Sequence, residues 1–99
     1  MMTKEVFNEK VLETVKFVAR LKLSGDPNEG NLTKLDFICD LMGAVLSVEV
    51  YYPISVEKCA DYFMQHADIQ DAKKLADMLR ELYIMSRTIQ KVKYITTVL

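Results

Sequence analysis

Three pairs of carboxylates are each spaced four residues apart, a spacing that places both acids on one face of a helix. The pairs are Asp36/Asp40, Glu57/Asp61 and Asp77/Glu81. Carboxylates on neighbouring helices can hold Mg²⁺ against phosphate groups, as in an all-helical phosphohydrolase. However, such pairs also arise readily on solvated faces of amphipathic helices, and no Lys or Arg is obviously placed to clamp a phosphate. A Mg-dependent phosphohydrolase is therefore the second alternative function, ranked behind nucleic-acid binding.

The remaining candidates for catalysis or metal binding are few. His66 is the only histidine, and neither a Ser nor a Cys beside it forms a recognised nucleophile motif. We interpret it as a solvated or helix-capping residue. Cys39 and Cys59 lack the paired close spacing of zinc ligands, and we expect both to be small, buried, unpaired hydrophobic residues. The sequence thus predicts no enzyme, no cofactor and no metal.

Charge is unevenly distributed along a chain whose net charge is −1. Residues 24–82 carry a net charge of −6, whereas residues 83–99 carry +3 and no acid. The basic C-terminal segment favours an alternative function, nucleic-acid binding, through its cations and an adjacent tyrosine. The residues expected to do this are Arg87, Lys91, Lys93 and Tyr94. The near-zero total charge argues against a general affinity for phosphate backbones.

Apolar periodicity predicts a mainly α fold, a small bundle in one domain over residues 1–99. The predicted helices cover about residues 4–23, 33–46, 56–67 and 69–86 or longer. Thr3, Thr33, Ser55 and Asp68 are suitable N-caps for these four segments. For the second segment, the side chains expected to face the core are Leu35, Ile38, Leu41, Met42 and Val45.

Two stretches leave an α+β alternative open. Residues 46–52 alternate apolar and polar side chains up to Pro53, which is typical of a strand. Residues 88–98 are rich in β-branched side chains, which suit strands better than helices. The two stretches are therefore candidates for a minor two-stranded element, with a longer second and fourth helix as the other possibility.

The last third of the chain holds a heptad seam, in which apolar residues recur at alternating spacings of three and four. Its members are Leu75, Met78, Leu82, Met85, Ile89 and Val92. A continuous helix over residues 68–99 would be about 48 Å long, longer than the roughly 30–35 Å diameter of a compact domain of this size. We therefore expect the seam to be an interface between two copies of the chain.

The function predicted from these features is that of a non-enzymatic interaction or accessory protein, forming a homodimer and binding a protein partner whose identity is open. Small size without catalytic motifs is typical of proteins encoded by viruses or mobile elements. No apolar run approaches the roughly 20 residues of a transmembrane helix, and the N-terminus lacks a signal-peptide pattern. We accordingly expect a cytoplasmic protein without membrane contact.

Overall fold

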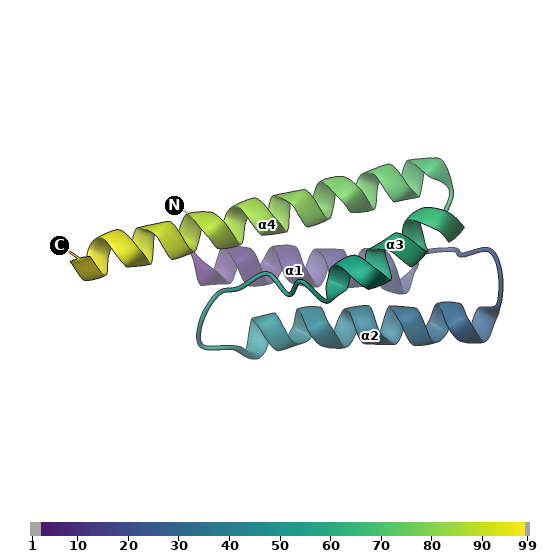
Figure 1. The fold of residues 1–99 in the computed structure, drawn as a ribbon, viewed down its shortest axis with the longest axis horizontal. Coiled ribbons are helices and arrows are strands. Elements are labelled where there is room, and N and C mark those ends of the chain that lie inside the picture. Colours follow the sequence, from purple (N-terminus) through teal and green to yellow (C-terminus); the bar gives the residue numbers. More distant parts are fainter. Residues whose placement is uncertain (1–2, 99) are drawn as a thin grey trace.

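The computed structural model describes residues 3–98, with side chains up to Lys91. It contains four helices, α1 (Lys4–Ala19), α2 (Pro27–Leu46), α3 (Val56–His66) and α4 (Ile69–Val98) (Figure 1). The prediction of a mainly α bundle is confirmed, and no strand occurs between residues 3 and 98. Within the same range, no helix combines the length and the apolar character required to cross a membrane.

Side-chain caps fix where the helices begin. The Thr3 hydroxyl accepts a hydrogen bond from the Val6 N–H at 3.3 Å, and the Asp68 carboxylate accepts one from the Asp71 N–H at 2.9 Å. Both caps were predicted. The predicted cap at Thr33 is wrong, because α2 begins two turns earlier with Asp26 as its cap and Pro27 in its first turn. The Thr33 hydroxyl instead donates to the Glu29 carbonyl within the helix, at 2.8 Å.

The helices run alternately up and down the long axis, and α1 and α3 each pack against both α2 and α4 (Figure 1). Between α2 and α3, residues 47–55 form an irregular connector that returns along the body, so α3 is the shortest helix. The C-terminal turns of α4 project beyond the other three helices (Figure 1). The molecule is consequently elongated, measuring 52 × 23 × 19 Å.

The core lies where all four helices face one another. Phe37 of α2 and Phe63 of α3 meet edge to face at 5.4 Å between ring centroids, a favoured geometry for aromatic pairs. Leu82 of α4 and Val11 of α1 are completely buried and belong to the same core cluster. The burial of these large side chains is the main source of stability for helices that would be marginal alone.

Neither half of the predicted two-stranded element is a strand. Residues 88–98 continue α4. At Ile89, which is buried against the core, packing outweighs the low helix propensity of a β-branched residue. Residues 47–52 belong to the connector, in which Val50 is buried and its carbonyl accepts a hydrogen bond from the Gln90 side chain at 2.9 Å. The α+β alternative is therefore excluded for the described part of the chain.

The first helix ends at Ala19, four residues earlier than predicted. Leu21 leaves the helix and is buried in the core, and the Lys34 ammonium donates to its carbonyl oxygen at 2.5 Å. The chain then turns at Gly25, whose φ of +90° is a conformation that suits glycine. The Ser24 N–H donates to the His66 carbonyl at 2.9 Å, so this loop is anchored to the end of α3.

Candidate interaction surface

The α4 seam, defined as Leu75, Met78, Leu82, Met85 and Ile89, lies inside the chain's own fold. Each of these side chains is at most 9% exposed, and Leu75 and Leu82 are completely buried. They are covered by helices of the same chain, since α1 and α3 both pack against α4. The single chain therefore already covers these five residues, and the interface between two copies that was expected here stays a prediction. The side chain of Val92, the sixth predicted member, lies outside the described residues.

A second series with the same spacing is found on the outer face of α2. Its members, which we call the α2 stripe, are Leu32, Leu35, Cys39, Met42 and Leu46. Leu32 is 64% exposed, Leu35 57% and Leu46 81%. Cys39 is exposed and Met42 is half-buried. Val48, in the connector just beyond the helix, is 88% exposed.

The position of the α2 stripe follows from which side of α2 faces the core. The buried residues of the helix are Gly30, Phe37, Leu41 and Ala44. At 3.6 residues per turn, the α2 stripe lies on the opposite side of the helix from them. The predicted core face of this segment was therefore wrong for Leu35 and Met42, which belong to the outer side.

The two borders of the α2 stripe differ in charge. Helical geometry places Glu29, Asp36 and Asp40 along one border. Along the other border lie Asn31, Lys34, Ile38 and Val45, of which the last three are half-buried. No charged side chain interrupts the stripe itself, so its outer face is a continuous apolar strip with one acidic border.

The two cysteines differ in their surroundings, and neither forms a disulfide. Cys59 of α3 is half-buried, and burial together with the nearby Asp36 and Asp40 carboxylates raises the pKa of its thiol. Cys39 is exposed at the middle of the α2 stripe. The expectation that both are buried is wrong for Cys39, because its helix turns it away from the core.

The outer face of α4 carries a row of cations. We call this set, Lys73, Arg80, Arg87 and Lys91, the basic row. All four are exposed, and their spacings of seven, seven and four place them along one side of the helix. Tyr83, half exposed, lies beside them and packs edge to face on Tyr52 at 5.5 Å. Of the residues predicted to bind nucleic acid, Arg87 and Lys91 belong to this row, while the side chains of Lys93 and Tyr94 lie outside the described residues.

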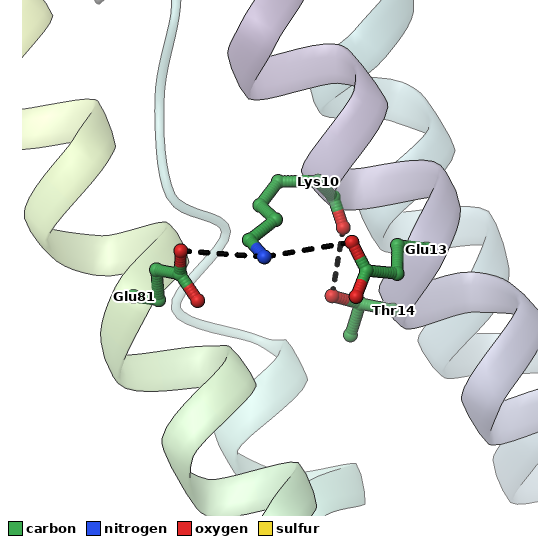
Figure 2. A network of polar contacts seen from close by, with 4 residues as sticks. All are labelled: Lys10, Glu13, Thr14 and Glu81. Atoms are coloured by element: carbon green, nitrogen blue, oxygen red, sulfur yellow. Dashed lines mark hydrogen bonds and ion pairs between the residues drawn. The ribbon is translucent and has the colours of Figure 1, made fainter.

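A polar network joins α1 to α4 at the edge of the α4 seam (Figure 2). The Lys10 ammonium lies 3.3 Å from a Glu81 carboxylate oxygen and 3.5 Å from one of Glu13 (Figure 2). These contacts raise the pKa of Lys10, mainly through its hydrogen bond to Glu81. The neighbouring Thr14 hydroxyl is buried and donates to the Lys10 carbonyl at 2.9 Å. This network positions the two helices and leaves Glu81 paired with a lysine.

The carboxylate pairs and His66 do not assemble into a recognisable catalytic centre. Across the described residues, no three His, Cys, Asp or Glu side chains come together in a way that could hold a metal ion. The His66 ring stacks on Tyr62 at 4.1 Å, and its Nδ1 lies 3.4 Å from the Ser24 hydroxyl. The third group of a triad, a carboxylate orienting the imidazole, is not among the contacts of His66 in the part of the chain that the structure describes.

A hollow between two of the helices also lacks a clear ligand preference. It lies between α1 and α4 and has a volume of about 330 Å³. Its walls include the cations Lys16, Arg20 and Lys74 together with the acids Glu13 and Asp71. Because both signs of charge are interspersed around an open hollow, the surroundings favour neither an anionic nor a cationic small molecule.

The α2 stripe is the site that the sequence analysis did not identify. Its signal was present, because the spacings between its members are three, four, three and four. The same helix has a second apolar side, however, and spacing alone does not tell which side faces the core. The chain matches no model of a known protein family, no curated protein sequence and no solved structure.

Proposed function

We propose that this protein is a non-enzymatic interaction protein that presents the α2 stripe to another protein chain. The observation that carries the proposal is that this stripe, with three leucines more than half exposed, remains uncovered by the chain's own helices. Soluble monomers rarely expose a contiguous apolar strip of this extent, and such strips mark interaction sites. The heptad spacing is the one that suits a helix as the contacting element.

The proposal replaces the α4 seam by the α2 stripe as the contact surface. The α4 seam is occupied by the core, whereas the α2 stripe has no competing structural role in the single chain. A cytosolic location is part of the proposal, and the unpaired state of the two cysteines supports it, since reducing compartments keep thiols free.

The proposal is tested by thiol footprinting at Cys39 in the cells that produce the protein. A partner on the α2 stripe covers Cys39, so a maleimide should label it far more slowly in cells than in dilute purified protein. Cys59 is the internal reference, because it is half-buried in the single chain and its raised pKa slows its reaction in both settings.

The matched variant is Leu35→Glu, which places a charge on the exposed stripe without touching the core. It should restore fast labelling of Cys39 in cells. Equal labelling of Cys39 in cells and in dilute solution would contradict the proposal.

Nucleic-acid binding is the second candidate function, and the basic row favours it. Four exposed cations in line with an exposed tyrosine form a surface that can contact phosphates and stack on a base. Nearby acids oppose it, since Asp77 and Glu81 are exposed on the same helix. For this reason it ranks second.

A labelled single-stranded oligonucleotide tests this candidate at low and moderate salt. Replacing Arg80, Arg87 and Lys91 by Ala should weaken binding and flatten its salt dependence. The control removes three exposed lysines elsewhere, Lys16, Lys22 and Lys58. If the native chain does not bind at low salt, or if both triple variants lose the same affinity, the basic row is not a nucleic-acid site.

A further inference from the structure

We propose that the hollow between the connector and α4 binds one nucleotide, with its base against tyrosine rings and its phosphate on Arg87. This hollow shares no residue with the α2 stripe, so the inference goes beyond the proposed function. It also deepens the second candidate function, because it assigns a place for a base beside the basic row. A free nucleotide and one unit of a single strand share this chemistry, and experiment distinguishes the two sources.

The walls of the hollow come from two segments that are far apart in the sequence. The connector contributes Tyr51, Tyr52 and Ile54, and α4 contributes Tyr83, Ser86, Arg87 and Gln90. Two contacts join these segments. Tyr52 packs edge to face on Tyr83, and the Gln90 side chain donates to the Val50 carbonyl. These contacts fix the connector against α4, so the hollow is part of the folded chain.

The tyrosines favour a flat, ring-shaped ligand. Tyr83 is 50% exposed and Tyr51 is 37% exposed, so part of each side chain is open to a ligand. Nucleobases stack on aromatic side chains of this kind, whatever the base. The volume of the hollow, about 240 Å³, is below the roughly 300–1,000 Å³ of pockets for drug-sized molecules. The hollow therefore suits a single ring system.

The charge of the hollow selects an anion. Among the described residues that line it, Arg87 is the only charged one. Aromatic rings can also enclose an ammonium group, but Arg87 would repel a cation and no lining carboxylate offsets that repulsion. An arginine binds phosphate oxygens through paired hydrogen bonds. A nucleotide, which joins a planar ring to a phosphate, matches both parts of the hollow.

Gln90 favours a nucleobase over a plain aromatic ring. Its amide nitrogen donates to the Val50 carbonyl at 2.9 Å, which fixes the direction of the side chain. A primary amide carries a second N–H and a carbonyl oxygen, the donor and acceptor with which Gln pairs with the edge of a base. The Ser86 hydroxyl is committed elsewhere, because it is buried and donates to the Tyr83 carbonyl at 2.8 Å.

The exposed acids Asp77 and Glu81 of α4 lie on the far side of the basic row. Each residue step turns an α-helix by about 100°, which places Tyr83 on one side of Arg87 and the two acids on the other. Glu81 also lies 3.3 Å from the Lys10 ammonium of α1. A phosphate that reaches Arg87 from the hollow therefore approaches on the side away from both acids.

A neighbouring hollow explains why Arg87, rather than Arg80, is the expected phosphate contact. The two hollows share Tyr52 and Tyr83, and the neighbour has both Arg80 and Glu57 in its walls. Glu57 offsets the charge of Arg80 and would repel a phosphate bound there. Of the two hollows, the one at Arg87 combines the tyrosines with an unopposed cation.

The first experiment is an NMR titration of the isotope-labelled native chain with thymidine monophosphate, continued into the millimolar range at low salt. Deoxyribose phosphate, which lacks the base, is the control ligand. Thymidine monophosphate should shift the amide signals of residues 51–54 and 83–87 until they saturate. Deoxyribose phosphate should bind at least about fivefold more weakly, because it cannot stack on an aromatic ring. Equal affinity for the two ligands, or saturating shifts confined to other residues, would show that no base binds in this hollow.

The second experiment separates the ring from the charge with matched variants. Tyr83→Leu should weaken the binding of thymidine monophosphate by about fivefold or more, whereas Tyr83→Phe keeps the ring and should bind like the native chain. Arg87→Gln should also weaken binding. Lys73→Gln should not, although it removes an exposed cation of the same row about four turns away. Circular dichroism establishes that each variant is folded. Native affinity in folded Tyr83→Leu or folded Arg87→Gln would contradict the inference.

A short oligothymidylate distinguishes the two sources of the nucleotide. Tighter binding of this strand than of thymidine monophosphate, weakened by Tyr83→Leu, assigns the hollow to a single strand. Binding of the monophosphate with no gain for the strand assigns it to a free nucleotide. If strand binding is lost when the basic row is replaced by Ala but is unchanged in Tyr83→Leu, nucleic-acid binding stands and the base site is wrong. If neither ligand binds, the inference is overturned, and the proposal for the α2 stripe is unaffected.

Discussion

On α4, the apolar residues spaced by three and four are buried, whereas on α2 most residues with the same spacing are exposed. Leu82 is completely buried and Leu35 is 57% exposed, although both are members of regular apolar series on long helices. The difference lies in the rest of each helix. The outer side of α4 is charged, while α2 has apolar residues on both its inner and outer sides. An apolar heptad thus shows that one side of a helix is apolar. Whether that side is buried within the chain depends on whether the other side of the helix is charged or also apolar.

The largest expected effect is that of a charge in the α4 seam. Leu82→Asp places a carboxylate at a completely buried position, and an unpaired buried charge costs more than most of the roughly 5–15 kcal/mol that stabilises a domain. We expect loss of helical circular dichroism at 25 °C. A folded Leu82→Asp chain that had only changed its oligomeric state would show that the α4 seam is an interface after all.

The next effect compares the two sides of α2 directly. Phe37→Ala should lower the free energy of unfolding by about 3–5 kcal/mol, because it leaves a cavity beside Phe63. Leu35→Ala, two residues away, should change it by no more than about 0.5 kcal/mol. Urea denaturation at low micromolar concentration, where the single chain dominates, provides both values. Similar losses for the two variants would mean that the outer side of α2 is covered within one chain.

A smaller effect is expected from protein concentration. If the α2 stripe joins two copies, the dimer is favoured by mass action and the melting temperature should rise by a few degrees for each tenfold increase in concentration. In Leu35→Glu the melting temperature should not depend on concentration. If the melting temperature of the native chain is constant across the micromolar range, the α2 stripe does not join two copies.

The smallest effect concerns the network at the edge of the α4 seam. Replacing Lys10 by Met removes an exposed contact to Glu81, and exposed ion pairs contribute little to stability. The folded chain raises the pKa of Lys10 above its ordinary value of 10.5. The contribution of the Lys10 contacts to stability is therefore fully present below the ordinary pKa of 10.5. It is lost as pH rises through the higher pKa that Lys10 has in the folded state. The small difference in melting temperature between native and Lys10→Met chains should vanish in strongly alkaline buffer. A large difference at neutral pH would show that the network, rather than the apolar seam, holds α1 to α4.

Local signals in the sequence were sufficient to predict most of the helices. Thr3 and Asp68 cap where expected, because a side-chain oxygen followed by an amphipathic segment is a local pattern. The start of α2 was missed because the Asp-Pro pair at residues 26–27 resembles a turn as well as a cap followed by Pro in the first turn. Residues 88–98 continue α4. At Ile89 the side chain is buried against distant segments of the chain, and local propensity does not contain such a contact.

The candidate site was harder to predict than the fold. Cys39 and Cys59 both lie among apolar residues in the sequence, but only the packing of α2 against α1 and α3 decides that Cys39 faces outward. Likewise, the apolar spacing of the α4 seam is typical of an interface, but α1 and α3 cover the seam within the chain. Which apolar face stays exposed depends on how all four helices pack together. The pattern of a single helix therefore does not predict it.

The projecting end of α4 affects how the molecule moves in solution. A particle of 11.4 kDa with dimensions of 52 × 23 × 19 Å experiences more friction than a sphere of equal mass. It will elute early from a gel-filtration column and tumble faster about its long axis than end over end. NMR relaxation should therefore differ between amide bonds parallel and perpendicular to α4.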